Sequence, residues 1–356
     1  MDENELAMLG DSVREVLQSE CPHDMVLRHV DGEDLREPLW RTVKDLGWTA
    51  LSAGEEYGGL GLGPDALALL YRELGTALAP VPLLPTLIAS ELLYRFGNAE
   101  QRSEWLGGIA AGERRVALMQ MGATPLRLVR SGSSVKLYGT AEHVLELKGA
   151  DLALVLARSD EGETARVMIH LQEDGVVAFE QPLVDVTRSF GKLRLDALQL
   201  PAGRVLGGPQ LEHAIACHGT LAIAADSTGG ADTILALTVE YLKTREQFGR
   251  LIGSFQALKH RCADHKMALV AAEAILDDAV SSTAADQEAW PDLSAAKVAA
   301  SEAYAALAQD AVQLHGGIGF TWEHVCHLFL KRAKLNQSLF GSTGWHLDQI
   351  GRQLAA

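Results

Sequence analysis

The spacing of apolar residues changes twice along this chain of 356 residues, and the two changes limit the folds open to it. From 116 to about 206, apolar residues alternate or form short runs rich in Val and Leu, with turn-forming residues between them. After this segment, long Ala-rich stretches carry apolar residues at helical spacing. Before it, the same helical spacing of three and four is seen at Leu67, Leu70, Leu74 and Leu78.

These segments predict an α+β fold that is mostly α and has three domains. Residues 1–115 would form an N-terminal α-helical domain, residues 116–206 a small antiparallel β domain, and residues 207–356 a C-terminal four-helix-type bundle. The small residues of the last segment favour long helices that pack closely in a bundle. A parallel doubly wound sheet is not expected, because strands and helices do not alternate along the chain.

Composition argues against two kinds of partner. The formal net charge is −16, whereas binding to nucleic acid requires a basic face. No run approaches the roughly 18 uninterrupted apolar residues of a membrane helix, and the N-terminal stretch is acidic and unlike a signal peptide. The chain is therefore expected to be cytoplasmic and to bind neither nucleic acid nor membrane.

Two long motifs lie in the last third of the chain. Thr244–Gln256 reads TREQFGRLIGSFQ, and Ala311–Lys334 reads AVQLHGGIGFTWEHVCHLFLKRAK. They resemble signatures of the acyl-CoA dehydrogenase family, in which Arg-x-x-Phe-Gly precedes Phe-Gln and, later, Gln-x-x-Gly-Gly-x-Gly-Phe. Glu55–Gly61 and Asp185–Arg188 are also similar to that family. The resemblance covers essentially the whole chain and is weakest at 116–180.

The resemblance implies an FAD-dependent enzyme that oxidises an acyl-CoA substrate. Arg245 would hold the pyrophosphate of FAD, because a guanidinium can bind phosphate oxygens bidentately. Gly316 and Gly317 would approach the adenosine diphosphate part of an FAD bound by a neighbouring subunit, since they lack a Cβ. The implied cofactor-binding residues are Arg245, Gln247, Phe248, Phe255, Gln256, Gln313, Gly316 and Gly317.

The catalytic base of the family is missing from this sequence. The family reaction removes a proton next to the thioester carbonyl, and a carboxylate must accept it. One family position for this Glu corresponds to Phe340, and the other, 26 residues before Arg245, corresponds to Gly219. Neither side chain can accept a proton, so no catalytic residue is predicted at the family positions.

The stretches that face the flavin ring in the family also differ. They correspond to residues 119–125 and 142–146, and neither stretch offers the usual flavin contacts. Loss of base and ring platform, with the other FAD motifs kept, resembles the non-catalytic subunit of bacterial heterotetrameric acyl-CoA dehydrogenases that act on steroid side-chain CoA thioesters. A homologous catalytic subunit is therefore the implied partner, and it would supply the Glu.

Two other readings stay open. The chain could be a self-sufficient homo-oligomeric flavoenzyme with a displaced base, for which Asp226 is the candidate because it lies two helical turns after Gly219. It could instead be a non-enzymatic paralogue that has lost FAD. No metal site is predicted: the cysteines form no C-x-x-C pair, and His324 and His327 fall in a family segment where histidines are ordinarily structural.

Overall fold

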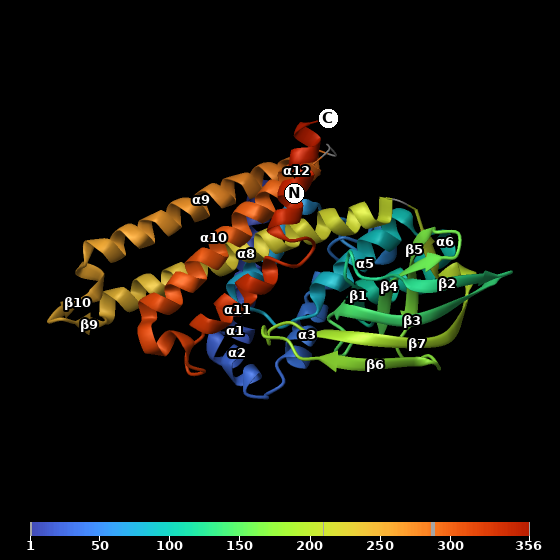
Figure 1. Ribbon diagram of the computed structural model, residues 1–356, viewed down its shortest axis with the longest axis horizontal. Helices are drawn as coiled ribbons and strands as arrows, with labels where there is room; N and C mark the ends of the chain where they lie inside the picture. Colours follow the sequence, from blue (N-terminus) through green and yellow to red (C-terminus); the bar gives the residue numbers. More distant parts are fainter. Residues whose placement is uncertain (1, 209, 286–288, 356) are drawn as a thin grey trace. The chain divides into compact units, whose positions relative to one another are not determined.

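The computed structural model describes residues 2–208, 210–285 and 289–355. Its first part is helical (Figure 1), and Pro64 is the first residue of the helix that carries Leu67, Leu70 and Leu74. At the N-terminus, the Asp2 side chain accepts the Glu5 N–H while the Glu5 side chain accepts the Asp2 N–H, which caps the first helix. The helices are α1 (Glu3–Glu20), α2 (His23–Val30), α3 (Arg36–Asp45), α4 (Pro64–Thr76), α5 (Leu83–Phe96), α6 (Ala99–Gln101) and α7 (Gly107–Ala110).

The middle part is an eight-stranded sheet with the order β6-β7-β3-β1-β4-β5-β8, in which β2 pairs with both β3 and β4. Most neighbouring strands are antiparallel, as predicted, but β4 runs parallel to β1 and β2. The reason is topological: β3 is antiparallel to β1, and the chain then crosses over to place β4 on the other side of β1. The strands are β1 (Val116–Met119), β2 (Leu126–Ser131), β3 (Ser134–Leu145), β4 (Leu152–Ser159), β5 (Thr164–His170), β6 (Val176–Gln181), β7 (Phe190–Pro201) and β8 (Val205–Gly207).

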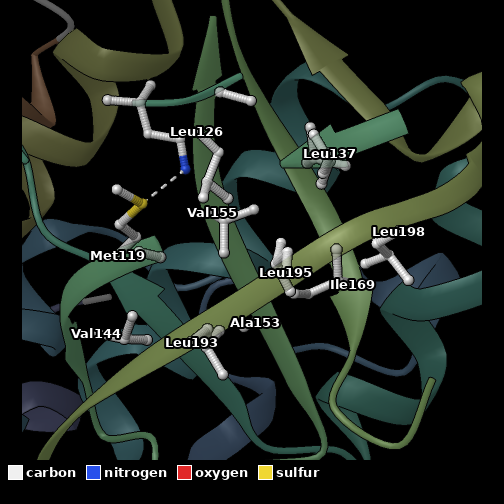
Figure 2. Close-up of a cluster of buried hydrophobic side chains, with 14 of the residues drawn as sticks. Met119, Leu126, Leu137, Val144, Ala153, Val155, Ile169, Leu193, Leu195 and Leu198 are labelled. Carbon is white, nitrogen blue, oxygen red and sulfur yellow. Dashed lines mark hydrogen bonds between the residues drawn. The ribbon is translucent and has the colours of Figure 1, made fainter. Parts of the chain in front are cut away.

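Aliphatic side chains from several strands form the core of the sheet domain (Figure 2). Met119, Val144 and Leu193 are fully buried in it. The Sδ atom of Met119 accepts a hydrogen bond from the Leu156 backbone N–H at 3.3 Å. The apolar residues that alternate in the sequence therefore lie on the face of these strands that points into the core.

The last part of the chain is built from long helices (Figure 1). One of them, α10, buries residues around much of its circumference, including Tyr304 and Lys297. By contrast, α9 buries a narrower stripe that includes Leu269, Ala272 and Leu276. The elements are α8 (Gln210–Thr244), β9 (Glu246–Gln247), β10 (Arg250–Leu251), α9 (Gln256–Ala284), α10 (Trp290–His315), the short 3-10 helix Gly316–Phe320, α11 (Cys326–Asn336) and α12 (Thr343–Leu354).

The order of a helical part, a β part and a helical part confirms the predicted fold class. The chain forms two compact units, one made of residues 1–35, 63–80 and 219–356 and the other of residues 36–62 and 81–218. These units do not follow the predicted domain limits, and the division at 115 and 206 stays a prediction. Among the described helices, none combines the length and the apolar character needed to cross a bilayer.

Candidate cofactor and catalytic positions

Arg245 begins a short hairpin directly after α8. Its backbone N–H donates to the Tyr241 carbonyl at 3.0 Å, and its own carbonyl accepts the Ile252 N–H at 2.9 Å. Between these contacts β9 pairs with β10, and Phe248 and Gly249 form the turn with φ values of 57° and 72°. Positive φ at both turn residues is typical of a type I′ hairpin. The Arg245 side chain is exposed, so its guanidinium is available to an anionic ligand.

The other residues of this motif form an open, partly aromatic surface. Phe248 is 91% exposed and meets the ring of Phe255 edge-on, with the two centroids 6.2 Å apart. The Arg250 guanidinium lies 3.8 Å from the Phe255 ring centroid on a cation–π contact. Gln247 and Gln256 are exposed, and Gln256 is the first residue of α9. The exposed side chains of Gln247, Phe248, Arg250 and Gln256 can therefore meet a ligand from outside.

The second motif ends α10 and turns the chain. The N–H of Gly316 donates to the carbonyl of Gln313, whose side chain is exposed. Gly316 has φ 63° and ψ −139°, a backbone conformation open mainly to glycine. At Gly316 and Gly317, no atom lies within 4 Å of the place where a Cβ would be. The backbone here is therefore bare and accessible.

The two motifs lie at the same end of the helices (Figure 1). A stacked pair of rings joins them: Tyr241 lies near the end of α8 and His315 at the end of α10. Their centroids are 4.6 Å apart and their planes are inclined by 24°. The ends of α8 and α10, which are about 70 residues apart in the sequence, thus meet through this ring contact.

The two positions expected to carry the base, Gly219 and Phe340, are in contact with each other. A Cβ at Gly219 would lie 2.1 Å from Cδ1 of Phe340. Both residues are buried, and Phe340 is 1% exposed. The ring of Phe340 therefore fills the space directly in front of the Gly219 backbone.

Buried polar side chains hold the segment around Phe340, which has φ 53°. The Lys297 ammonium donates to the carbonyls of Gln337 and Gly341. His346 Nε2 lies 3.1 Å from the Phe340 carbonyl, where it can act as the donor. Burial lowers the pKa of Lys297 to about 8, and burial together with the nearby Lys297 charge lowers the pKa of His346 to about 4.

Asp226 is engaged in a buried ion pair. Its carboxylate accepts hydrogen bonds from Arg332 Nε at 3.1 Å and Arg332 Nη2 at 2.5 Å. A third donor, Asn336 Nδ2, lies 2.7 Å from Oδ1. Asp226 is 3% exposed and Arg332 is 2% exposed. Since the carboxylate is both paired and buried, its geometry is that of a structural group.

Parts of the two stretches expected to face the flavin ring are buried in the sheet domain. Met119, Val144 and Leu145 are fully buried. Glu146 is also buried, and its Oε2 accepts hydrogen bonds at 2.9 Å from both Arg36 Nη1 and Ser189 Oγ. Met119, Val144, Leu145 and Glu146 are therefore not accessible to a flavin ring, whereas Gly122, Thr124 and His143 are exposed.

His324 and His327 contact rings. The His324 ring lies 4.8 Å from that of His315, and the His327 ring lies 4.8 Å from that of Trp322. Within the described residues, no group of three His, Cys, Asp or Glu side chains is arranged to hold a metal ion.

Comparison with known proteins decides the family. The model of the acyl-CoA dehydrogenase N-terminal domain matches residues 3–113, and that of the C-terminal domain matches residues 214–355. The chain belongs to the acyl-CoA dehydrogenase family.

One relative and two solved structures illustrate its place in this family. Acyl-CoA dehydrogenase FadE27 of Mycobacterium tuberculosis is 32% identical over 98% of this chain and 96% of its own length. The crystal structure of the ChsE4-ChsE5 complex from the same organism contains a chain that is 30% identical, with a TM-score of 0.92 over 100% of this chain and 98% of that one. A chain of the Tcur3481-Tcur3483 steroid acyl-CoA dehydrogenase, G363A variant, is 31% identical, with a TM-score of 0.89 over 99% and 98%.

FAD is the cofactor of acyl-CoA dehydrogenases, and the residues present fit one part of it. An exposed Arg245 and the bare backbone of Gly316 and Gly317 suit a phosphate-bearing ligand. The buried Met119 and Leu145 do not suit contact with a flavin ring. In this acyl-CoA dehydrogenase-family chain, Arg245, Gly316 and Gly317 are therefore accessible to a phosphate-bearing ligand, whereas the side chains of Met119 and Leu145 are not accessible to a ring.

Reasoning from the sequence missed two features of this site. The stack of Tyr241 on His315 could have been suspected, because one residue lies a helical turn before Arg245 and the other directly before Gly316. The contact between Gly219 and Phe340 carries no such signal, because it joins residues distant in the sequence. It becomes visible only when the helices are packed.

Proposed function

We propose that this chain is the non-catalytic subunit of a heteromeric acyl-CoA dehydrogenase. It would contribute the phosphate-binding end of the FAD site to a homologous catalytic partner. The observation that carries this proposal is the contact between Gly219 and Phe340, which leaves no carboxylate at either family position. The complex would catalyse α,β-dehydrogenation of an acyl-CoA thioester.

The chemistry explains why a partner is required. When FAD is bound, it accepts the hydride from the β-carbon. The α-proton needs a base within hydrogen-bond reach, and such a base typically contributes about 10²–10⁴-fold to the rate. Phe340 has no acceptor atom, and its ring excludes water and other side chains from Gly219. The partner must therefore supply the carboxylate.

This chain would then bind the cofactor at its phosphate end, away from the atoms that react. The exposed guanidinium of Arg245 would pair with phosphate oxygens, and the backbone at Gly316 and Gly317 would lie against the dinucleotide. Charge-assisted contacts of this kind position a ligand without taking part in proton transfer. The exposed Phe248 and Phe320 would be covered by the partner, since large exposed apolar groups near a site often mark an interface.

The names of similar proteins suggest the class of substrate. The Tcur3481-Tcur3483 protein is named a steroid acyl-CoA dehydrogenase, and ChsE4-ChsE5 is named a complex. We propose a steroid side-chain CoA thioester as the substrate of the complex formed by this chain. This step rests on similarity and not on a pocket of this chain.

The self-sufficient flavoenzyme is the less favoured candidate. It requires Asp226 as base, but that carboxylate is held by Arg332 and Asn336 and is nearly inaccessible. The non-enzymatic paralogue is also less favoured, because the exposed Arg245 and the bare glycine turn have no evident structural task.

Flavin content tests the proposal. The chain purified alone should be pale, and the chain co-expressed with a homologous catalytic subunit from its own host should be yellow and carry FAD. The flavin is released, identified by mass spectrometry and compared with the amount of each subunit. About one FAD per chain in the protein purified alone would contradict the proposal and favour the self-sufficient enzyme.

A further inference from the structure

We infer that the stacked rings of Tyr241 and His315 set the spacing between the two FAD-binding segments, so that both reach the same dinucleotide. The inference rests on the proposed function, because it concerns the same FAD site. It makes Tyr241 and His315 positioning residues, which act through Arg245 and Gly316.

Each ring lies next to the group that it would position. Tyr241 precedes Arg245 by four residues, and the Arg245 N–H donates to the Tyr241 carbonyl at 3.0 Å. His315 directly precedes Gly316, whose N–H is bound to the Gln313 carbonyl. A displacement of either ring is therefore passed through one short, hydrogen-bonded stretch of backbone to the ligand-facing group.

The ring of His315 is held on several sides. It is 2% exposed, and its Nδ1 lies 2.8 Å from the Ala311 carbonyl, so this nitrogen carries the hydrogen. Tyr241 stacks on it, and His324 lies at 4.8 Å with its ring tilted by 46°. Its Nε2 has no hydrogen-bond partner in the described part of the chain. Aromatic contacts and the polar contacts of Nδ1 with the Ala311 carbonyl and, at 3.8 Å, with Cys326 Sγ thus hold the ring, and burial lowers its pKa, which favours the neutral form.

The turn after His315 packs closely on the last turn of α10. A Cβ at Gly319 would lie 2.6 Å from the Val312 carbonyl and 3.0 Å from Cβ of His315. The glycine turn is thus folded back tightly onto the end of α10. The ends of α8 and α10 can separate only if the stack of Tyr241 on His315 opens.

This arrangement predicts an effect on FAD that exceeds the effect on folding. Binding groups must be held within about 0.5 Å of their productive geometry. Loss of the stack would leave the long helices intact and loosen the distance between Arg245 and Gly316. A residue with only a structural role would lower the thermal stability without a specific loss of flavin affinity.

The test uses the heteromeric complex, stripped of flavin and titrated with FAD while flavin fluorescence is followed. His315→Ala and Tyr241→Leu should each raise the FAD dissociation constant about tenfold, and the double variant should be no weaker than either, because both remove one contact. His315→Phe keeps a ring for stacking and should bind FAD within about threefold of the unchanged complex. The melting temperature of each flavin-free complex is measured in parallel.

The matched control lies at the other end of α10. Trp290 and Trp345 form an aromatic pair there, with centroids 5.8 Å apart. Trp345→Leu should lower the melting temperature about as much as His315→Ala while FAD affinity stays unchanged. An equal loss of FAD affinity in Trp345→Leu would overturn the inference.

Arg245→Ala separates this inference from the proposed function. If Arg245→Ala weakens FAD binding and His315→Ala and Tyr241→Leu do not, the positioning role is wrong and the proposed FAD site stands. If Arg245→Ala also leaves FAD affinity unchanged, the proposed site is wrong and the positioning role falls with it.

Discussion

The ring of Phe340 packs directly on the backbone of Gly219, so the residue at one family position for the catalytic carboxylate fills the space beside the other. Gly219 can face Phe340 only because it has no side chain. Phe340, in turn, is buried and adopts a positive φ of 53°. Its neighbours hold that conformation, since Lys297 binds the carbonyl of Gly341 and His346 lies at that of Phe340.

Gly219→Ala should destabilise the protein by about 1–3 kcal/mol, because the added methyl group meets the Phe340 ring in a packed core. Elsewhere in a helix the same change stabilises by about 0.5–1 kcal/mol. Gly351 in α12 is the matched control, since its Cβ would meet no atom within 4 Å. Urea unfolding of both variants measures the two effects. If Gly219→Ala stabilised the protein as much as Gly351→Ala, Phe340 would not occupy the space beside Gly219.

Asp226→Asn should lower the free energy of unfolding by about 3–5 kcal/mol, because it leaves the buried Arg332 without its carboxylate. Asp232→Asn on the same helix removes an exposed pair with Lys266 and should cost about 0–1 kcal/mol. Chemical denaturation of the two variants provides the comparison. A cost for Asp226→Asn no larger than that of Asp232→Asn would argue against a structural role for the buried pair.

Much of the fold could be predicted from local patterns. The changes of apolar spacing near 116 and 206 report helices and strands, because periodicity is a local property of the chain. The parallel pairing of β4 with β1 could not be predicted, since it depends on which side of β1 the crossover places β4. The compact units also escaped prediction, because residues 1–35 and 63–80 join the C-terminal helices through tertiary packing.

The candidate site was predictable to a similar degree. The absence of a carboxylate at Phe340 and Gly219 is visible in the sequence, and the assignment of FAD contacts to Arg245 and Gly316 stays a prediction. The ion pair of Asp226 with Arg332 could not be predicted, because the two residues lie 106 residues apart in the sequence. Residue type indicates what chemistry is available, whereas packing determines which groups are already occupied.

Arg245→Ala should weaken the binding of FAD to the assembled complex by about 1.5–3 kcal/mol, through loss of a charge-assisted contact to phosphate. Lys243→Ala is the control, because Lys243 is exposed nearby and pairs with Glu240 at 2.7 Å. Titration with FAD at fixed ionic strength gives both affinities. If Lys243→Ala is as damaging as Arg245→Ala, the effect comes from general charge and not from a specific contact.

The stability of the protein should fall as the pH drops from about 6.5 to 4. Burial lowers the pKa values of His327 and His346 from 6.5 to about 4, so between these values the unfolded state binds more protons than the folded state. Their contribution is therefore complete above pH 6.5 and is lost on acidification. These two groups should add about two protons to the uptake on unfolding.

The slope of the unfolding free energy against pH measures this uptake. His346→Gln keeps a side-chain donor for the Phe340 carbonyl and removes the titrating ring. It should reduce the slope between pH 4 and 6.5 by about one proton. A slope unchanged in His346→Gln would show that His346 titrates normally in the folded protein.

Steady-state acyl-CoA dehydrogenation by the purified chain, supplied with FAD and an artificial electron acceptor, tests the central claim most directly. We predict no turnover of a steroid side-chain CoA thioester by the chain alone, and turnover once the catalytic partner is co-expressed. Phe340→Glu and Gly219→Glu should not restore activity to the isolated chain, because the stretches 119–125 and 142–146 differ from those that the family places against the flavin ring. Steady turnover by the pure chain, abolished by Asp226→Asn in a variant that still folds, would contradict the account and identify a self-sufficient enzyme.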